Sequence, residues 1–564
     1  MEKTWWKNAV GYQIYPRSFY DSNNDGVGDL KGIIQKLDYI KDLGVNLIWI
    51  GPFYKSPMDD NGYDVSDFYD VDPLFGTLQD AKDLIAQAHQ RGIKIILDLV
   101  LNHTSDEHPW FIESRSSLDN PKREYYIWQP GKKDAHGHLH APTNWGSFFE
   151  GSAWNFDPIT NQYYMKIFSD KMPDLNWASP ALREEMYKMA KWWLDQGIDG
   201  FRVDAIAHLA RDLSFTDSTM PLNSHHVAPD WGKFSNRPEL FDYLKEFNEK
   251  VLRHYDAMTV GEVGGGASVE AGVKYAGYDA HIFNMVFNFD TCWKNNIFGN
   301  DNLKDEDVVI NVLDMKLTFN RWIQGMKGKG WMPQYWLNHD HPRVMSQYGD
   351  PIHHHRESGA LLGTILLTLP GTPFIYNGEE IGMTNVDYTS IDDFTDIWVK
   401  NYYKQAIKTL SKEQILSFLR RTSRNNARTP MQWDDSMYAG FSTHEPNQKN
   451  VGNYPQINVA KQQGEPNSIL NTYKKLIRLR KDSKYSETLI YGDFKLIHPK
   501  DPNVFAYLRS YEGQEVMVIF NFSKQTNDFV LNKTYKHVIF NNYDNAHTHK
   551  TLHLKPYEAM IVEV

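Results

Sequence analysis

Six side chains of the kinds used in acid–base chemistry stand at or near the ends of segments that look like buried strands. They are His103, Arg202, Asp204, Glu262, His339 and Asp340. The carboxyl ends of the strands of a parallel barrel face its active site, so these groups should meet at one rim. Carboxylates at one rim suit the cleavage of a glycosidic bond, because one must be ionised while another donates a proton to the leaving oxygen.

The spacing around Arg202 favours a division of these roles. Arg202 and Asp204 are two positions apart and therefore share one face of a strand. A neighbouring guanidinium keeps a carboxylate ionised, which makes Asp204 the candidate nucleophile. Like charges close together push one pKa upward, so Glu262 becomes the candidate acid. For any single member of the set, a buried ion pair remains the alternative.

The elements that must position these residues alternate in type along the chain. Strands are predicted over residues 10–15, 46–53, 93–103, 200–205, 258–263, 282–289, 334–339 and 373–376. Amphipathic helices are predicted between them, for example over residues 30–43, 77–91 and 181–197. This alternation predicts an α/β fold of the closed (β/α)8 TIM-barrel type. A doubly wound open sheet is the competing fold, but the glycine-rich phosphate loop that it needs after the first strand is missing.

Two stretches depart from the alternation. Residues 105–177 are rich in Trp, Tyr, Pro, Asn and Gly without a strong helical period, which predicts a subdomain inserted after the third strand. Residues 486–564 turn into short alternating runs, which predict a C-terminal antiparallel β-sandwich domain. The barrel would then comprise residues 1–104 and 178–485.

Composition limits the partners and the location. The 564 residues include 60 basic and 71 acidic side chains, and a net charge of −11 without a basic stripe makes nucleic acid an unlikely partner. Cys292 is the only cysteine, so no internal disulfide can form, as is typical of a reducing compartment. No signal-type apolar segment opens the chain, and the longest apolar stretch, 360–369, is too short for a membrane span. We expect a cytoplasmic monomer or weak homo-oligomer with no membrane partner.

Longer motifs carry a resemblance to a known family. Residues 98–103 (DLVLNH), 200–204 (GFRVD), 261–263 (GEV) and 338–340 (NHD) resemble the four signature regions of the α-amylase superfamily of retaining glycoside hydrolases. Residues 12–17 (YQIYPR), 60–64 (DNGYD) and 427–433 (ARTPMQW) are similar to its oligo-1,6-glucosidase/α-glucosidase branch. The similarity spans nearly the whole chain.

The resemblance implies a role for each motif residue. Asp204 would be the nucleophile, Glu262 the acid/base and Asp340 the stabiliser of the transition state. Arg202 would support Asp204, and Asp98 would orient Arg202 unless it is only a buried paired carboxylate. One terminal glucose would be bound by hydrogen bonds from His103 and His339, stacking on Tyr63, an Asp60–Arg428 pair at its 4-hydroxyl, and Phe149 and Phe168 at the pocket mouth. A closed pocket of this kind implies exo-action on short oligosaccharides.

A loop with oxygen-bearing side chains at alternate positions resembles a calcium-binding loop. Its ligands would be the side chains of Asp21, Asn23, Asp25 and Asp29 and the carbonyl oxygen of Val27. Gly32 stands where an EF-hand needs Glu, so this is not an EF-hand, but it is similar to the ion loop that follows the first strand in this branch. The expected ion is a structural Ca²⁺, with Mg²⁺ or a plain Asx-rich turn as alternatives.

Departures from the branch pattern bear on the substrate. Ala205 follows the nucleophile where 1,6-cleaving relatives tend to have Val, and Met172 replaces a usual Gln, which together favour α-1,4 links such as that of maltose. The same-class alternative is oligo-1,6-glucosidase. Sucrose isomerase is disfavoured because residues 289–296 lack an arginine-rich stretch, and trehalose-6-phosphate hydrolase because no additional cation can be placed near the second subsite. A catalytically silent transporter subunit would lack the carboxylates that are present here.

Overall fold

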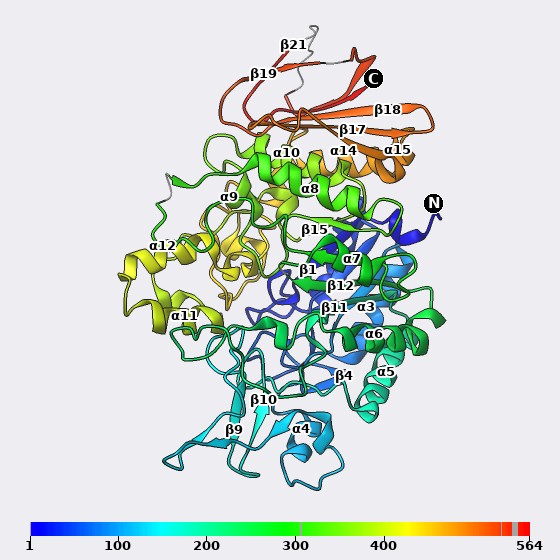
Figure 1. Cartoon of the computed structure of the whole chain (residues 1–564). Coiled ribbons are helices and arrows are strands. Elements are labelled where there is room, and N and C mark those ends of the chain that lie inside the picture. Colours follow the sequence, from blue (N-terminus) through cyan, green and yellow to red (C-terminus); the bar gives the residue numbers. More distant parts are fainter. Residues whose placement is uncertain (1, 265, 305–306, 532, 544–550) are drawn as a thin grey trace.

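The computed structural model describes residues 2–264, 266–304, 307–531, 533–543 and 551–564. Eight parallel strands form one sheet in the order β13-β12-β11-β5-β2-β1-β15-β14 (Figure 1). Their bounds are β1 Gly11–Ile14, β2 Leu47–Ile50, β5 Lys94–Val100, β11 Gly200–Asp204, β12 Met258–Gly264, β13 Met285–Asn288, β14 Pro333–Tyr335 and β15 Thr372–Tyr376. The two end strands meet where Tyr335 Oη donates a hydrogen bond to the carbonyl oxygen of Asn288 at 2.5 Å. The predicted TIM barrel is therefore confirmed.

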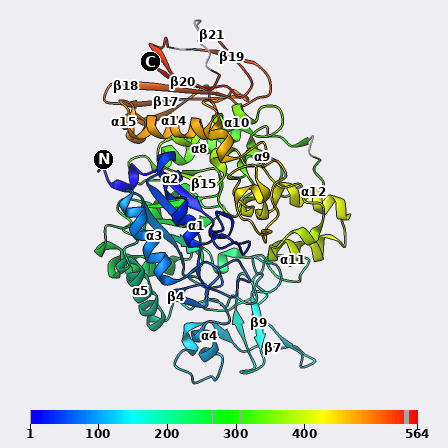
Figure 2. The same ribbon diagram turned by 180° about the vertical axis from the view of Figure 1, so that it is seen from behind.

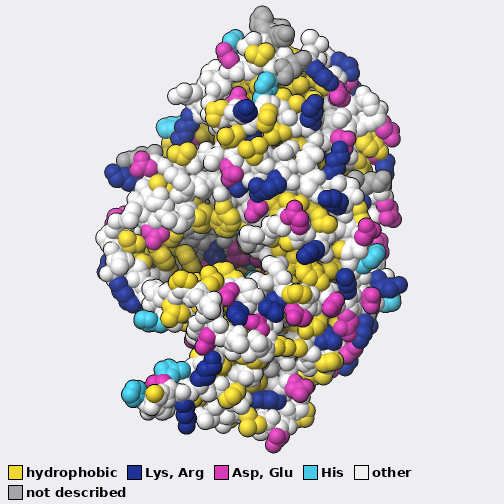
Figure 3. Space-filling model, viewed as in Figure 1, with side chains coloured by type: hydrophobic (Ala, Val, Ile, Leu, Met, Phe, Trp, Pro, Cys, Tyr) yellow, Lys and Arg dark blue, Asp and Glu magenta, His cyan; other side chains and the backbone are white. Residues whose placement is uncertain are grey.

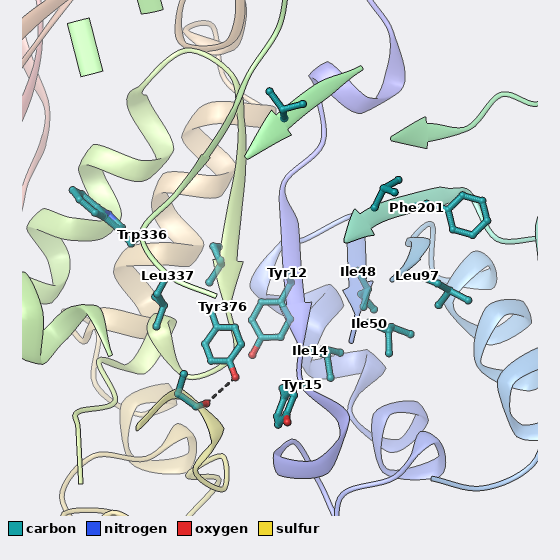
Figure 4. Packing of buried hydrophobic residues seen from close by; sticks show 14 of the residues in the cluster. Tyr12, Ile14, Tyr15, Ile48, Ile50, Leu97, Phe201, Trp336, Leu337 and Tyr376 are labelled. Carbon is teal, nitrogen blue, oxygen red and sulfur yellow. Dashed lines mark hydrogen bonds between the residues drawn. The ribbon is translucent and has the colours of Figure 1, made fainter. Parts of the chain in front are cut away.

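The strands are apolar almost throughout because both faces of a parallel barrel strand are covered. All four residues of β2 are buried, as are all five of β11 and of β15. Figure 4 shows side chains from β1, β2 and β15, among them Tyr12, Ile48 and Tyr376, packed together in this core. Charged groups within such strands, such as Asp98 and Arg202, must therefore find partners inside the protein.

Helices surround the barrel (Figures 1 and 2). The helices that cover it are α1 Leu30–Gln35, α2 Leu37–Leu43, α3 Leu78–Gln90, α5 Pro180–Asp195, α6 Pro238–Lys250, α7 Val269–Ala276, α8 Val312–Met326, α9 Val344–Tyr348, α10 His355–Thr368, α13 Val459–Gln463 and α14 Ile469–Lys481. The single helix predicted over residues 30–43 is divided at Lys36, whose ammonium group lies 4.0 Å from the centre of the Tyr20 ring and 4.2 Å from that of Trp433. Among the described residues, no helix has both the length and the apolar composition that crossing a membrane requires.

The predicted insertion carries its own small elements between β5 and β11. A three-stranded sheet, β6-β10-β9, is accompanied by a two-stranded hairpin, β7-β8, and by α4 Pro109–Ser114. The strand bounds are β6 Trp128–Gln129, β7 Lys132–Lys133, β8 Leu139–His140, β9 Trp154–Asp157 and β10 Gln162–Met165. The insertion is tied to the barrel by Asp174, which accepts hydrogen bonds from Arg211 at 3.0 Å and Asn102 at 3.2 Å. These hydrogen bonds attach the insertion close to the carboxyl end of β5.

The C-terminal strands form the predicted sandwich. A five-stranded antiparallel sheet, β16-β17-β18-β22-β20, packs against a two-stranded sheet, β19-β21. Their bounds are β16 Asp493–Ile497, β17 Val504–Tyr511, β18 Gln514–Asn521, β19 Asn527–Val530, β20 His537–Asn541, β21 Thr551–Leu554 and β22 Ala559–Glu563. Alternate residues such as Phe505 point the other way and pack on the barrel helices, where Phe505 stacks on Phe319 of α8. The helix α15 Ser486–Tyr491 occupies the start of the range predicted for this domain.

A further segment, with the helices α11 Ile397–Ala406 and α12 Lys412–Thr422, follows β15. Figure 1 shows it in yellow-green at the side of the barrel, above the inserted strands β9 and β10. A 3-10 helix, Arg424–Arg428, leads from α12 back to the barrel. This segment supplies basic side chains to the site.

Candidate active site

Arg202 is the centre of a buried cluster built from three neighbouring strands. Strand β11 is paired in register with β5, so that Arg202 lies opposite Asp98, and β12 brings Glu262 to the other side. Arg202 Nη1 donates hydrogen bonds to Asp98 and, at 2.7 Å, to Asp204, while Nη2 donates to Glu262. The predicted support of Asp204 by Arg202 and the orientation of Arg202 by Asp98 are both present.

The two candidate catalytic carboxyl groups lie close together but are held in different protonation states. Asp204 and Glu262 share a side-chain hydrogen bond. Burial raises the pKa of Glu262 to about 8 against the pull of Arg202, and the charges of Asp204 and Asp340 raise it further. Burial raises the pKa of Asp204 only to about 6, because Arg202 favours its ionised form. At neutral pH the pair therefore offers one carboxylate and one carboxylic acid, as a glycosidase needs.

Asp340 belongs to a second ionic cluster that keeps it charged. Its Oδ1 accepts hydrogen bonds from Arg424 at 3.1 Å and from Arg428 at 2.8 Å. Burial alone would raise the pKa of Asp340, but the positive charges of Arg424, Arg428 and Arg202 bring it well below its ordinary range. A fixed negative charge so close to the catalytic pair can stabilise a positive centre.

The expected Asp60–Arg428 pair is wrong. Asp60 instead accepts a hydrogen bond from Arg424 at 2.9 Å, and Arg428 is taken by Asp340 and by the carbonyl oxygen of His339. Arg424 is also bound to Asp396, a fully buried carboxylate at the start of α11. Arg424 and Arg428 stand at the two ends of one short 3-10 helix, and Arg424 is the one that reaches Asp60.

Arg424 and Asp396 were missed by the sequence interpretation. The signal available in the sequence was a second arginine, Arg424, only four positions before Arg428. Nothing in the sequence around Asp396 indicates that it folds back beneath two arginines.

The two histidines, His103 and His339, differ in whether a ring nitrogen remains available to a substrate. Both ring nitrogens of His339 are hydrogen-bonded, Nδ1 to Gln13 Nε2 at 2.9 Å and Nε2 to Tyr63 Oη at 2.7 Å. The ring is also stacked between Tyr15 and Tyr63. Asn102 lies within hydrogen-bond distance of His103 Nδ1, whereas the buried Nε2 has no hydrogen-bond partner among the residues that the structure describes. Burial lowers the pKa of both rings to about 3, so both are neutral. His103 thus presents a free donor, whereas His339 positions Tyr63.

Aromatic rings from the insertion reach this rim as predicted. The Phe168 ring lies 5.3 Å from His103 and 5.4 Å from Phe149, and the Arg424 guanidinium lies 5.4 Å from the Phe149 ring. Figure 3 shows a hollow in this face of the molecule, bordered by hydrophobic side chains and with acidic and basic side chains at its floor. Charged groups beneath an apolar rim suit a sugar, whose hydroxyls and apolar faces need both.

The pKa values predict a bell-shaped pH profile. Activity needs Asp204 ionised and Glu262 protonated, so kcat/KM should fall as pH drops through about 6 and again as pH rises through about 8. Initial rates between pH 4 and pH 10, at ~0.1 M ionic strength, check this. The Glu262→Gln variant should lose the alkaline limb; an alkaline limb unchanged in that variant would assign it to another group.

The predicted calcium loop closes mainly on its own backbone amides. Asp21 accepts from the amides of Asn24 at 2.7 Å and Gly26 at 2.8 Å, and Asp29 caps α1 by accepting from Gly32. Among the described residues, no group of three or more His, Cys, Asp and Glu side chains is arranged to hold a metal. The donor set of Asp21, Asn23, Asp25, Val27 and Asp29 is all oxygen, which chemically fits Ca²⁺.

Two family profiles and several known proteins match this chain. The profile described as the alpha amylase catalytic domain matches residues 13–492, and that of the alpha-amylase SusG C-terminal domain matches residues 504–561. The oligo-1,6-glucosidase of Parageobacillus thermoglucosidasius is 44% identical over 100% of both chains, and the alpha-glucosidase of Pediococcus pentosaceus is 40% identical over 99% of each.

Solved structures show the same architecture. The trehalose-6-phosphate hydrolase of Bacillus licheniformis has a TM-score of 0.91 at 37% identity, and the isomaltulose synthase of Protaminobacter rubrum one of 0.93 at 36% identity. Each match covers 100% of both chains. Together with the full-length match to oligo-1,6-glucosidases, these similarities show that the chain belongs to the alpha-amylase family of glycoside hydrolases.

Proposed function

We propose that the protein is a retaining exo-acting α-glucosidase that releases one glucose at a time from short gluco-oligosaccharides. The observation that carries the proposal is that Asp204 and Glu262 both accept hydrogen bonds from Arg202. Burial raises the pKa of Glu262 further than that of Asp204, which favours Glu262 as the proton donor. Asp204 attacks the anomeric carbon and Glu262 protonates the departing oxygen, which breaks the glycosidic bond. Glu262, now a carboxylate, then takes a proton from water as the water cleaves the glucosyl–Asp204 ester.

The remaining groups support this course. Asp340, held ionised by two arginines, faces the positive charge that develops on the sugar ring. The free Nε2–H of His103 can bind a hydroxyl of the first glucose, and the Asp60–Arg424 pair closes one end of the site against a longer chain. One face of Tyr63 is taken by His339, so a sugar would meet its other face.

We propose α-1,6-linked disaccharides such as isomaltose as the first substrate class. Its support is that three relatives at 44% identity are named oligo-1,6-glucosidase. The α-1,4 link is the second candidate, favoured by Ala205, whose small side chain follows the nucleophile at a backbone φ of 46°. Ala205 leaves more room beside the nucleophile than the Val of 1,6-cleaving relatives would.

Initial rates on isomaltose and maltose test the proposed linkage. We expect kcat/KM on isomaltose to exceed that on maltose by at least about 10-fold, which corresponds to about 1.4 kcal/mol of transition-state binding. The reverse ratio would establish the α-1,4 candidate. Sucrose and trehalose 6-phosphate complete the panel, and a preference for either would contradict both candidates.

We propose that the loop of Asp21, Asn23, Asp25, Val27 and Asp29 binds a structural Ca²⁺, on the strength of its oxygen donors alone. A cation that binds only the folded state at about 100 times its Kd stabilises it by about 2.7 kcal/mol. EDTA should therefore lower Tm by a few degrees, and added Ca²⁺ should restore it. Asp25→Ala, which removes an exposed carboxylate, should lower Tm in Ca²⁺ and abolish the response to EDTA. An unchanged Tm of the wild-type protein in EDTA would refute the proposed ion site. Recovery of Tm with Mg²⁺ but not with Ca²⁺ would identify the ion as Mg²⁺.

We also propose a cytoplasmic location. Its support is the cysteine content: Cys292 is the single cysteine of the sequence, so no internal disulfide can form, as is typical of proteins in a reducing compartment. Cys292 is also buried, and burial raises the pKa of its thiol to about 12. Activity recovered in the soluble intracellular fraction of the source cells would support this, and activity in the medium would contradict it.

A further inference from the structure

Helix α11 is fixed against the active site at two points. At its start, Asp396 binds Arg424, the arginine that also holds Asp60 and Asp340, and caps the helix by accepting from the amide of Trp398 at 2.8 Å. One turn further on, Asn401 Nδ2 donates to the carbonyl oxygen of Phe149 at 3.4 Å. The helix thus runs from the charged floor of the site to the aromatic residue at its mouth.

Trp398 lies between these two points. It precedes Asn401 by three positions and therefore shares a helical face with it. Its indole ring stacks on Tyr402 with 5.3 Å between ring centres and 15° between planes, and Tyr402 rests in turn on Phe418 of α12. The indole ring is half-buried: Tyr402 supports it on one side, and part of its surface remains accessible to a ligand.

We infer that Trp398 is the stacking platform for the sugar that leaves, that is, for the residue on the far side of the bond being cleaved. The inference rests on the proposed function. In the proposed function the terminal glucose contacts the charged groups at the floor of the site. That floor is the deep end of α11, because Asp396 at the start of the helix is fully buried and bound to Arg424. A side chain at the level of Phe149 can touch only the part of the substrate that projects from the pocket.

The chemistry of the ring fits this occupant. A sugar ring presents an apolar face of C–H groups, and a flat, rigid indole offers a large contact area at a small loss of conformational entropy. Stacking on the leaving sugar contributes to the capture of disaccharides. It contributes nothing when the leaving group is a single atom.

Two substrates separate the leaving-group side from the rest of the site. Trp398→Ala should lower kcat/KM for the preferred disaccharide about 5- to 10-fold. The same variant should leave kcat/KM for α-glucosyl fluoride, which has only fluoride on that side, within about 2-fold of the wild-type value. Trp398→Phe should keep most of the activity on the disaccharide. Trp5→Ala, which removes a half-buried indole bound to Asp256 far from α11, is the matched control and should change neither substrate.

Equal losses on both substrates, or no loss on the disaccharide, would overturn the inference while leaving the proposed function intact. Failure of the wild-type protein to release glucose from either substrate would instead overturn the proposed function. Unchanged circular dichroism and Tm of Trp398→Ala ensure that a loss on the disaccharide alone is read as lost binding.

Discussion

Replacing Asp204 by Asn is expected to lower kcat/KM on every glucoside by about four orders of magnitude or more. The amide has nearly the same shape but lacks the negative oxygen that forms the glucosyl ester. Arg202 loses one of its three acidic partners but keeps Asp98 and Glu262, so the cluster can stay folded. Initial rates on the preferred disaccharide and on α-glucosyl fluoride measure the effect.

The control for this variant is Asp392→Asn. Asp392 is an exposed carboxylate on the surface, and its loss should change neither rate nor Tm. Retention of more than about 1% of the wild-type kcat/KM by Asp204→Asn, with product shown to come from the variant itself, would rule out Asp204 as the nucleophile.

Replacing Glu262 by Gln should give a loss that depends on the leaving group. On the disaccharide the loss is expected to be about 10³-fold, because the departing sugar oxygen needs a proton and Gln cannot supply one. Fluoride leaves without that proton, so the first step on α-glucosyl fluoride should be affected far less. Because Glu262 also serves as the base, the glucosyl ester on Asp204 should then accumulate.

Azide provides the second half of this test. It attacks without needing a base, so it should accelerate turnover of α-glucosyl fluoride by Glu262→Gln and yield α-glucosyl azide. The wild-type protein is the matched comparison, and its rate should not respond. Equal losses on both substrates, or no acceleration by azide, would show that Glu262 is not the acid/base.

Much of the fold could be predicted because its periodicities are local. Each predicted barrel strand overlaps a strand of the structure, since a parallel barrel strand is buried on both faces and therefore appears as a continuous apolar run. Strand ends were less exact. Strand β14 ends at Tyr335, so Asn338 and His339 lie in the following loop, where His339 is held by stacking between Tyr15 and Tyr63.

The catalytic residues could be predicted because they stand next to those strands. Arg202 and Asp204 are separated by two positions on β11, and strand register alone places Asp98 beside them. The Asp60–Arg424 pair joins residues 364 positions apart, and no sequence pattern decides whether Arg424 or Arg428 reaches Asp60. Asp396 and Trp398 depend in the same way on how the segment after β15 folds back onto the site.

The anomer released first is the most direct test of the account. If Asp204 forms an ester and Glu262 directs water to the same face, the configuration is inverted twice and therefore retained. Proton NMR in the first seconds after mixing enzyme with α-glucosyl fluoride, which releases no second glucose, should show the H1 signal of α-glucose before that of β-glucose. If β-glucose comes first, the reaction is a single displacement by water, and the nucleophilic role of Asp204 is contradicted.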